Sequence, residues 1–218
     1  MFENSLKGSW ALVLGSSSGF GEACSLELAR RGMNIFGVHL DRRGTMAKVE
    51  GIVEEIKSTG SEVKFYNVNV ADAEKRQEVI ADVKDVVQQD GSQVKVMIHS
   101  VAFGTLKHYI ADERKDVLST RNIDMTLDVM AHSIVYWAQD LVMEGLMGEG
   151  GRIFAMTSAG SRQVWPTYGA VSAAKAAIEV HIRQLAVELA PRGITANSIM
   201  AGVTDLSLIH ISEPTRPY

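Results

Sequence analysis

The sequence predicts an α/β fold in which helices cover both faces of a doubly wound parallel sheet. Short apolar runs alternate along the chain with longer segments whose apolar residues recur at helical spacing. A glycine-rich turn follows the first apolar run, and helices between successive strands impose right-handed crossovers, hence parallel strands. The 218 residues, 46% hydrophobic and 22% charged, suit one globular domain, and neither a repeat nor a linker divides them.

Each element has its own local signal. The first strand is expected at Trp10–Leu14, a short apolar run, and the first helix at 19–31, where Gly32 ends it. The second helix shows a single apolar face and ends at Gly60, and Asp72 is the expected N-cap of the third. The remaining strands are expected at 34–40, 63–68, 94–99, 152–156 and 195–199, and the remaining helices at about 46–59, 72–89, 118–147 and 167–190.

Composition excludes several classes of protein. The net charge of −4 offers no basic surface for nucleic acid. One cysteine, Cys24, excludes a disulfide framework and fits a reducing compartment. No apolar run reaches the roughly 18–20 residues of a membrane span, and residues 1–7 have no apolar signal core. The histidines lack metal-ligand spacing. We therefore expect a soluble cytoplasmic protein without a metal.

The last residues, Leu206–Tyr218, continue none of these patterns. Back-translation of 206–216 resembles the transposase adapter used in shotgun sequencing libraries, read in frame. We therefore interpret 1–205 as one incomplete dinucleotide-binding and catalytic domain and 206–218 as an adapter-derived tail, excluded from fold reasoning. The alternative is a natural flexible tail.

A candidate phosphate-binding loop joins the first strand to the first helix. Glycines there let the backbone turn tightly and approach a pyrophosphate, whose charge meets the helix N-terminus. An ordinary glycine-rich turn is the alternative, but the strand–loop–helix context favours a dinucleotide site. The candidate residues of the loop are Gly15, Ser17, Ser18, Gly19, Phe20 and Gly21.

The G-x-x-x-G-x-G spacing of this loop resembles the short-chain dehydrogenase/reductase superfamily, up to about Asp205, and implies a Rossmann-type fold that binds NAD or NADP. At the end of the second strand the resemblance places His39, not Asp41, where the ribose-binding acid usually sits. Arg42 and Arg43 offer bidentate contacts to a 2′-phosphate, which favours NADPH over NADH; a solvated turn is the alternative. Further cofactor contacts implied by the resemblance are Asn69, Val70, Ser100, Val101, Ala102 and Gly202.

Ser158, Tyr168 and Lys175 are the candidate catalytic residues. Reducing a polarised double bond requires hydride from nicotinamide and a hydrogen bond or proton at the oxygen that gains charge. A tyrosine hydroxyl supplies this when a nearby cation stabilises its anionic form, and a lysine also holds the nicotinamide ribose. Tyr168 and Lys175 are seven residues apart and share one helical face. A core tyrosine and a surface lysine are the alternative.

The Tyr-x6-Lys spacing is similar to that of a divergent branch of the superfamily, the enoyl-acyl-carrier-protein reductases. In the commoner pattern the tyrosine precedes the lysine by four, and that position here holds Val171. Three further segments resemble the branch: His99-Ser-Val-Ala-Phe103, Ala131-His132 and Met200-Ala201-Gly202. Met130 stands where carbonyl-reducing members have an asparagine for proton relay.

The resemblance implies an NAD(P)H-dependent reductase of the 2-enoyl double bond of an acyl-carrier-protein or CoA thioester, in fatty-acid synthesis. It also implies a homotetramer and, beyond Asp205, a substrate lid and an edge strand, so the acyl pocket is expected to be incomplete. Ser158 has a secondary role, because some members place a second tyrosine there. The alternatives are a carbonyl or dienoyl-CoA reductase on the same scaffold, and a nucleotide-binding protein without turnover.

Overall fold

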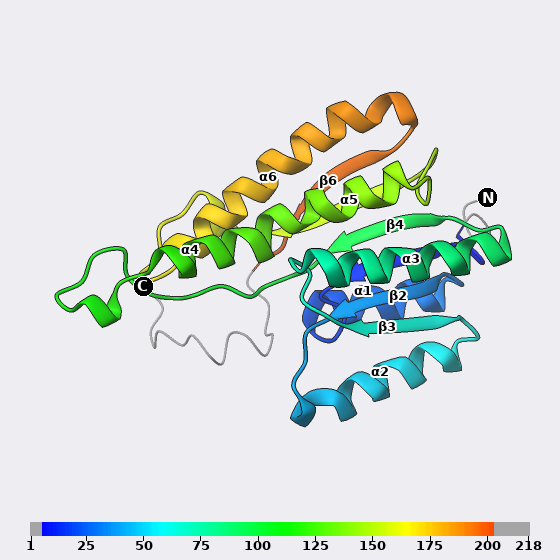
Figure 1. Cartoon of the computed structure of the whole chain (residues 1–218), viewed down its shortest axis with the longest axis horizontal. Coiled ribbons are helices and arrows are strands. Elements are labelled where there is room, and N and C mark those ends of the chain that lie inside the picture. The colour runs from blue at the N-terminus through cyan, green and yellow to red at the C-terminus, as the bar shows by residue number, and fades with distance from the viewer. Residues whose placement is uncertain (1–5, 203–218) are drawn as a thin grey trace.

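A computed structural model describes residues 6–202 and contains one six-stranded parallel sheet, as predicted. The strand order is β3-β2-β1-β4-β5-β6, so the chain crosses over after β3 and builds outward on both sides of β1 (Figure 1). In such a sheet the reversal of direction opens a crevice at the carboxyl ends of the strands. The strands are β1 Trp10–Leu14, β2 Asn34–His39, β3 Val63–Asn67, β4 Val94–His99, β5 Arg152–Thr157 and β6 Thr195–Met200.

Helices cover both faces of the sheet, and the strands divide their side chains between two cores. Successive side chains point to opposite faces, so Ala11 and Val13 pack with the helices α1 and α2. Leu12 and Leu14 pack with α3, α5 and α6. The helices are α1 Gly19–Arg30, α2 Met46–Ser58, α3 Ala73–Asp90, α4 Thr120–Leu127, α5 Ser133–Met143 and α6 Gly169–Leu189.

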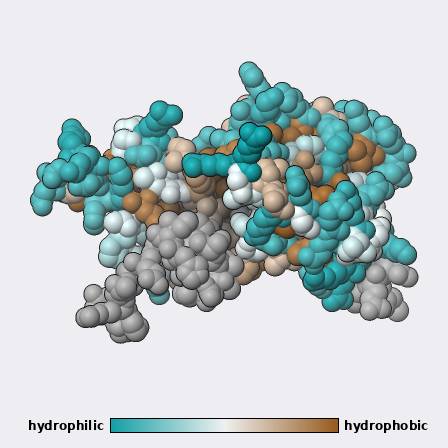
Figure 2. All heavy atoms as spheres, turned by 90° about the horizontal axis from the view of Figure 1, so that it is seen from below, coloured by the Kyte–Doolittle hydropathy of each residue, from teal (hydrophilic) through white to brown (hydrophobic). Residues whose placement is uncertain are grey.

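Local chemistry sets the helix ends. The Asp72 side chain accepts a hydrogen bond from the Lys75 N–H at 3.0 Å and caps α3, as predicted. Gly32 follows α1 with a φ of 86°, a conformation that favours glycine. On the face shown in Figure 2, hydrophilic side chains cover most of the coloured surface, with apolar side chains between them.

The helix predicted at 118–147 is present from Thr120 to Met143, but it contains a π-helical turn that was not predicted. Ser119 caps α4, which ends at Leu127, and Asp128–His132 forms a π-helical turn before α5 begins. Hydropathy periodicity misses such a turn, because one wider turn barely displaces the apolar face. The Ser133 N–H donates to the Asp128 carbonyl five residues back. Helix α5 ends at Met143, before Gly145 with a φ of 71°.

The segment between β4 and α4 leaves the sheet and extends to one end of the molecule, at left in Figure 1. It includes the short 3-10 helix η2, Arg114–Asp116, and an isolated bridge between His108 and Val117. The proposed tail at 206–218 lies outside the described residues. Within residues 6–202, no helix is long and apolar enough to cross a membrane.

Candidate active site

A cavity of about 580 Å³ opens where β1, β2, β4 and β5 end, beside the N-terminal half of α6. Parallel strands bring their carboxyl ends to one edge of the sheet, so loops distant in sequence meet there. The residues predicted from the sequence that line this cavity are Gly15, Ser18, Gly19, Phe20, His39, Asn69, Val70, Ser100, Val101, Ala102, Ser158, Tyr168, Lys175 and Gly202. Ser17, Gly21, Asp41, Arg42 and Arg43 do not line it.

Two glycines of the loop, Gly15 and Gly21, are packed too closely to carry a side chain. Gly15 has a φ of 87°, and a Cβ there would overlap the backbone carbonyl of Ser100. A Cβ on Gly21 would overlap the carbonyl of Gly15. Ser18 is the N-cap of α1, and its side chain does not accept a hydrogen bond from the first turn of the helix. The backbone N–H groups of that turn therefore lie at the edge of the cavity without a capping side chain. The cradle therefore fits a pyrophosphate at a helix N-terminus.

The end of β2 holds a compact polar cluster. His39 is 3% exposed, and its Nδ1 lies 3.0 Å from Oδ2 of Asp41, whose Oδ1 accepts from the Thr45 hydroxyl at 2.7 Å. Burial acts to raise the pKa of Asp41, but hydrogen bonds from Ser17, Thr45 and His39 lower it below its ordinary value. Hydrogen bonds thus fix the Asp41 carboxylate, whereas the Arg42 and Arg43 side chains are exposed.

Tyr168 occupies the N-cap position of α6 and lines the cavity. The residue before it, Thr167, has a φ of 62°, which is strained for a β-branched residue. The Tyr168 ring packs edge-on against Trp165 at 5.1 Å between centroids, and Gly160 leaves room for it, since a Cβ there would meet the ring. Strain and packing together direct the tyrosine to one position.

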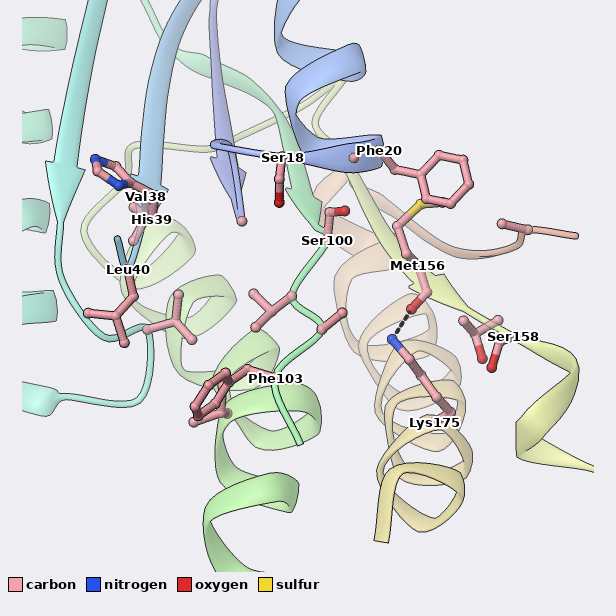
Figure 3. Close-up of a pocket in the computed structure, with 18 of the residues that line it drawn as sticks. Ser18, Phe20, Val38, His39, Leu40, Ser100, Phe103, Met156, Ser158 and Lys175 are labelled. Atoms are coloured by element: carbon pink, nitrogen blue, oxygen red, sulfur yellow. Dashed lines mark hydrogen bonds between the residues drawn. The ribbon is translucent and has the colours of Figure 1, made fainter. Parts of the chain in front are cut away.

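Lys175 lies two turns further along α6 and is 6% exposed. Its Nζ donates to the carbonyl of Met156 at 2.9 Å, and Figure 3 shows the side chain pointing there. Burial lowers the pKa of Lys175 to about 8. Val171, at the position of the commoner tyrosine, packs in the apolar core and does not line the cavity.

Ser158 follows β5, and its buried Oγ has no hydrogen-bond partner among the described residues. Just before it, the Thr157 hydroxyl donates to Oε1 of Glu179 on α6 at 2.8 Å, which ties the strand end to that helix. The unpartnered hydroxyl beside a cavity is available to a ligand oxygen.

Part of the cavity wall was not among the predicted site residues. These residues come from six separate segments, and Phe103 and Ala201 belong to segments already noted for their family resemblance. They are Val38, Leu40, Val68, Phe103, Met125, Val129, Met156, Thr157, Ala159, Gln163, Trp165 and Ala201. Their apolar majority gives the cavity a wall suited to an apolar ligand.

The doubly wound parallel sheet and the glycine loop define a nucleotide-binding α/β domain of the short-chain dehydrogenase/reductase class. The family model described as "Enoyl-(Acyl carrier protein) reductase" matches residues 15–213. The chain therefore belongs to this family, as predicted from its sequence.

Two kinds of relative agree with this assignment. The chain is 32% identical over 195 residues to 1-cyclohexenylcarbonyl-CoA reductase of Streptomyces collinus, covering 89% of this chain but only 64% of that enzyme's length. It is also 32% identical over 199 residues to the 3-oxoacyl-[acyl-carrier-protein] reductase of Staphylococcus epidermidis, covering 90% of this chain and 76% of that protein.

Solved structures show the same fold. A short-chain dehydrogenase from Burkholderia cenocepacia in complex with NADP has a TM-score of 0.77 at 27% identity, covering 94% of this chain and 78% of that one. A Serratia marcescens short-chain dehydrogenase/reductase has a TM-score of 0.80 at 24% identity, and the match covers 93% of this chain and 77% of the Serratia chain.

Proposed function

We propose that the whole protein reduces the C2–C3 double bond of a 2-enoyl thioester, carried by acyl carrier protein or CoA, with NADPH as the reductant. One observation carries this proposal. Tyr168 and Lys175 line the cavity that the glycine loop also lines, whereas Val171 is buried in the core. The pair that faces the cavity therefore has the Tyr-x6-Lys spacing and not the spacing of four.

Each side chain has a separate task in the proposed reaction. A nicotinamide held in this cavity would supply hydride to the β-carbon. The Tyr168 hydroxyl donates a hydrogen bond to the thioester oxygen, which gains negative charge as the enolate forms. The Lys175 ammonium adds positive potential next to Tyr168 and offers its remaining N–H donors to the cofactor ribose. The enolate then takes a proton from solvent at the α-carbon, which completes the addition of two hydrogens.

Ser158 and the apolar wall complete the substrate site. The unpartnered Ser158 hydroxyl offers a second hydrogen bond to the same thioester oxygen. Phe103, Met125 and Trp165 lie in the cavity wall and suit an apolar acyl chain. The family description and the Streptomyces relative support the assignment, because the name of that relative denotes a thioester with a ring double bond beside its carbonyl.

The second candidate is reduction of a 3-oxoacyl thioester, favoured by the Staphylococcus relatives. The same tyrosine would then protonate the ketone oxygen directly. Met130 argues against this reaction, since it is 2% exposed and has no polar atom to relay protons in the π-helical turn.

We also propose NADPH rather than NADH. Arg42 and Arg43 are exposed beyond the end of β2, where side chains can reach a 2′-phosphate without displacing buried groups. The Asp41 carboxylate already accepts hydrogen bonds from His39 and Thr45. The Burkholderia structure in complex with NADP supports this choice.

The full-length protein is proposed to form a homotetramer through α5 and α6, consistent with the exposed Met143, Val180 and Val187 on those helices.

The decisive experiment on function measures turnover of crotonyl-CoA and of acetoacetyl-CoA by the full-length protein, each with NADPH, from the loss of reduced nicotinamide. Turnover of crotonyl-CoA at least tenfold faster is expected. Turnover of acetoacetyl-CoA alone would replace the proposal with ketone reduction, and no turnover of either would favour a binding protein.

A further inference from the structure

His99 is a buried titratable residue that the proposed reaction does not use. It is the last residue of β4 and is 0% exposed. Its Nε2 lies 2.8 Å from the Ser133 hydroxyl, and that hydroxyl donates its own hydrogen to the Val129 carbonyl at 2.8 Å. Ser133 therefore accepts from Nε2–H, which leaves Nδ1 as an acceptor.

The Nδ1 atom of His99 is buried and has no hydrogen-bond partner among the described residues. A buried acceptor without a donor is costly, and a native protein normally pairs it. The Ser133 bond holds the ring in place, so Nδ1 cannot turn away to find a partner elsewhere.

Lys175, whose charge acts on His99, is a source of unused donors. In the parallel pairing of β4 with β5, His99 lies opposite Ala155, and the Lys175 Nζ binds the carbonyl of the next residue, Met156. An ammonium has three N–H donors, and Met156 takes one of them. Burial and the charge of Lys175 lower the pKa of His99 to about 3, so the imidazole is neutral at neutral pH and acts as an acceptor.

We infer that His99 is a positioning residue for Lys175, whose ammonium donates to Nδ1 of the neutral imidazole directly or through one water. The chain of contacts then runs from the π-helical turn at Val129 through Ser133 and His99 to Lys175. It holds the ammonium at the floor of the cavity and stabilises its charged form. The contact itself does not depend on the proposed function; only its effect on turnover through Lys175 does.

The other titratable groups near Lys175 and His99 either have hydrogen-bond partners of their own or lie elsewhere on the cavity wall. Glu179, one turn beyond Lys175, accepts from Thr157 of β5. On the π-helical turn, Asp128 accepts from the Tyr136 hydroxyl at 2.9 Å, and His132 pairs with His181 of α6 at 3.0 Å. Tyr168 stands at the start of α6, at the cavity wall. His99 is thus the neutral acceptor available to Lys175 from the strand side.

The test measures the pKa of Lys175 by competitive acetylation with acetic anhydride across pH, read by peptide mass spectrometry, with the exposed Lys7 as the internal control. His99→Asn keeps an oxygen acceptor at the Nδ1 position, whereas His99→Leu has similar volume and no acceptor. We expect the Lys175 pKa to fall by about one pH unit in H99L and to stay close to wild type in H99N. Equal values in wild type and H99L would overturn the inference, as would equal falls in both variants.

A second measurement keeps the inference testable if H99L does not fold. In 15N-histidine-labelled protein, the His99 Nδ1 resonance should show a hydrogen-bonded acceptor, and Lys175→Met should move it to the position of a free acceptor. An unchanged resonance in K175M would contradict the contact. Neither measurement uses an enoyl substrate, so a failure of the proposed reaction would leave both results interpretable.

Discussion

Replacing Lys175 by methionine tests the electrostatics of the site through the stability of the fold. Lys175 is 6% exposed, and burial lowers its pKa from 10.5 to about 8. A difference of about 2.5 pH units corresponds to about 3 kcal/mol at roughly 1.4 kcal/mol per unit. Below pH 8 the folded protein therefore contains an ammonium that would be better solvated in the unfolded chain.

The sign of the pH dependence follows from which state holds the proton. Between about pH 8 and pH 10.5 the unfolded chain binds a proton that the folded protein has released, so the wild type gains stability as pH rises. Methionine keeps the packing of the stem but loses the bond to Met156 and the inferred bond to Nδ1 of His99, each worth about 1 kcal/mol. At pH 7 we expect K175M to be more stable by about 1 kcal/mol, or roughly 2–4 °C in Tm.

The assay is urea unfolding of wild type and K175M at intervals from pH 6 to pH 11. The advantage of K175M should disappear across the titration of Lys175 and become a deficit of about 2 kcal/mol above it. The exposed Lys7, replaced by methionine, is the matched control and should show a small difference that does not vary with pH. A pH-independent difference for K175M, or a wild type that is more stable at pH 7, would refute the reasoning.

Three further predictions concern turnover and cofactor binding. Tyr168→Phe removes one hydroxyl at the cavity wall and should lower kcat for crotonyl-CoA by roughly 10²–10³ with little change in NADPH affinity; wild-type kcat would exclude the tyrosine from catalysis. Gly21→Ala places a methyl group on a backbone carbonyl and should abolish NADPH binding measured by calorimetry. The control Gly51→Ala, in open space on α2, should leave binding unchanged and raise stability by about 0.5–1 kcal/mol. Replacing Arg42 and Arg43 together by alanine should weaken NADPH binding by about 2–4 kcal/mol and spare NADH; equal losses for both cofactors would remove the arginines from 2′-phosphate recognition.

The alternation of strands and helices was predictable because it depends on local periodicity. The strand Val94–His99 has the predicted bounds, and Asp72 caps its helix as expected. A short apolar run between turn residues has few alternatives to a buried strand, and a carboxylate before a helix satisfies free N–H groups wherever it occurs. The glycine loop is a local signal of the same kind.

The π-helical turn at Asp128–His132 could not be predicted from local sequence patterns. Its apolar residues keep helical spacing, so the sequence predicts one long helix. The hydrogen bonds that join Ser133 to the Val129 carbonyl and to His99 on β4 connect the wider turn to the sheet, and no local pattern reveals them. The strained φ of Thr167 is equally invisible in the sequence, because β-branched residues normally avoid that conformation.

The sequence by itself determined the fold class, the loop and the spacing of Tyr168 and Lys175, since each depends on residues within a few turns of one another. The tertiary structure alone decided the depressed pKa of Lys175, the unpartnered atom of His99 and the apolar wall of the cavity. Burial and hydrogen-bond partners depend on segments brought together from across the chain, and a parallel sheet gathers those segments only after every crossover has been made.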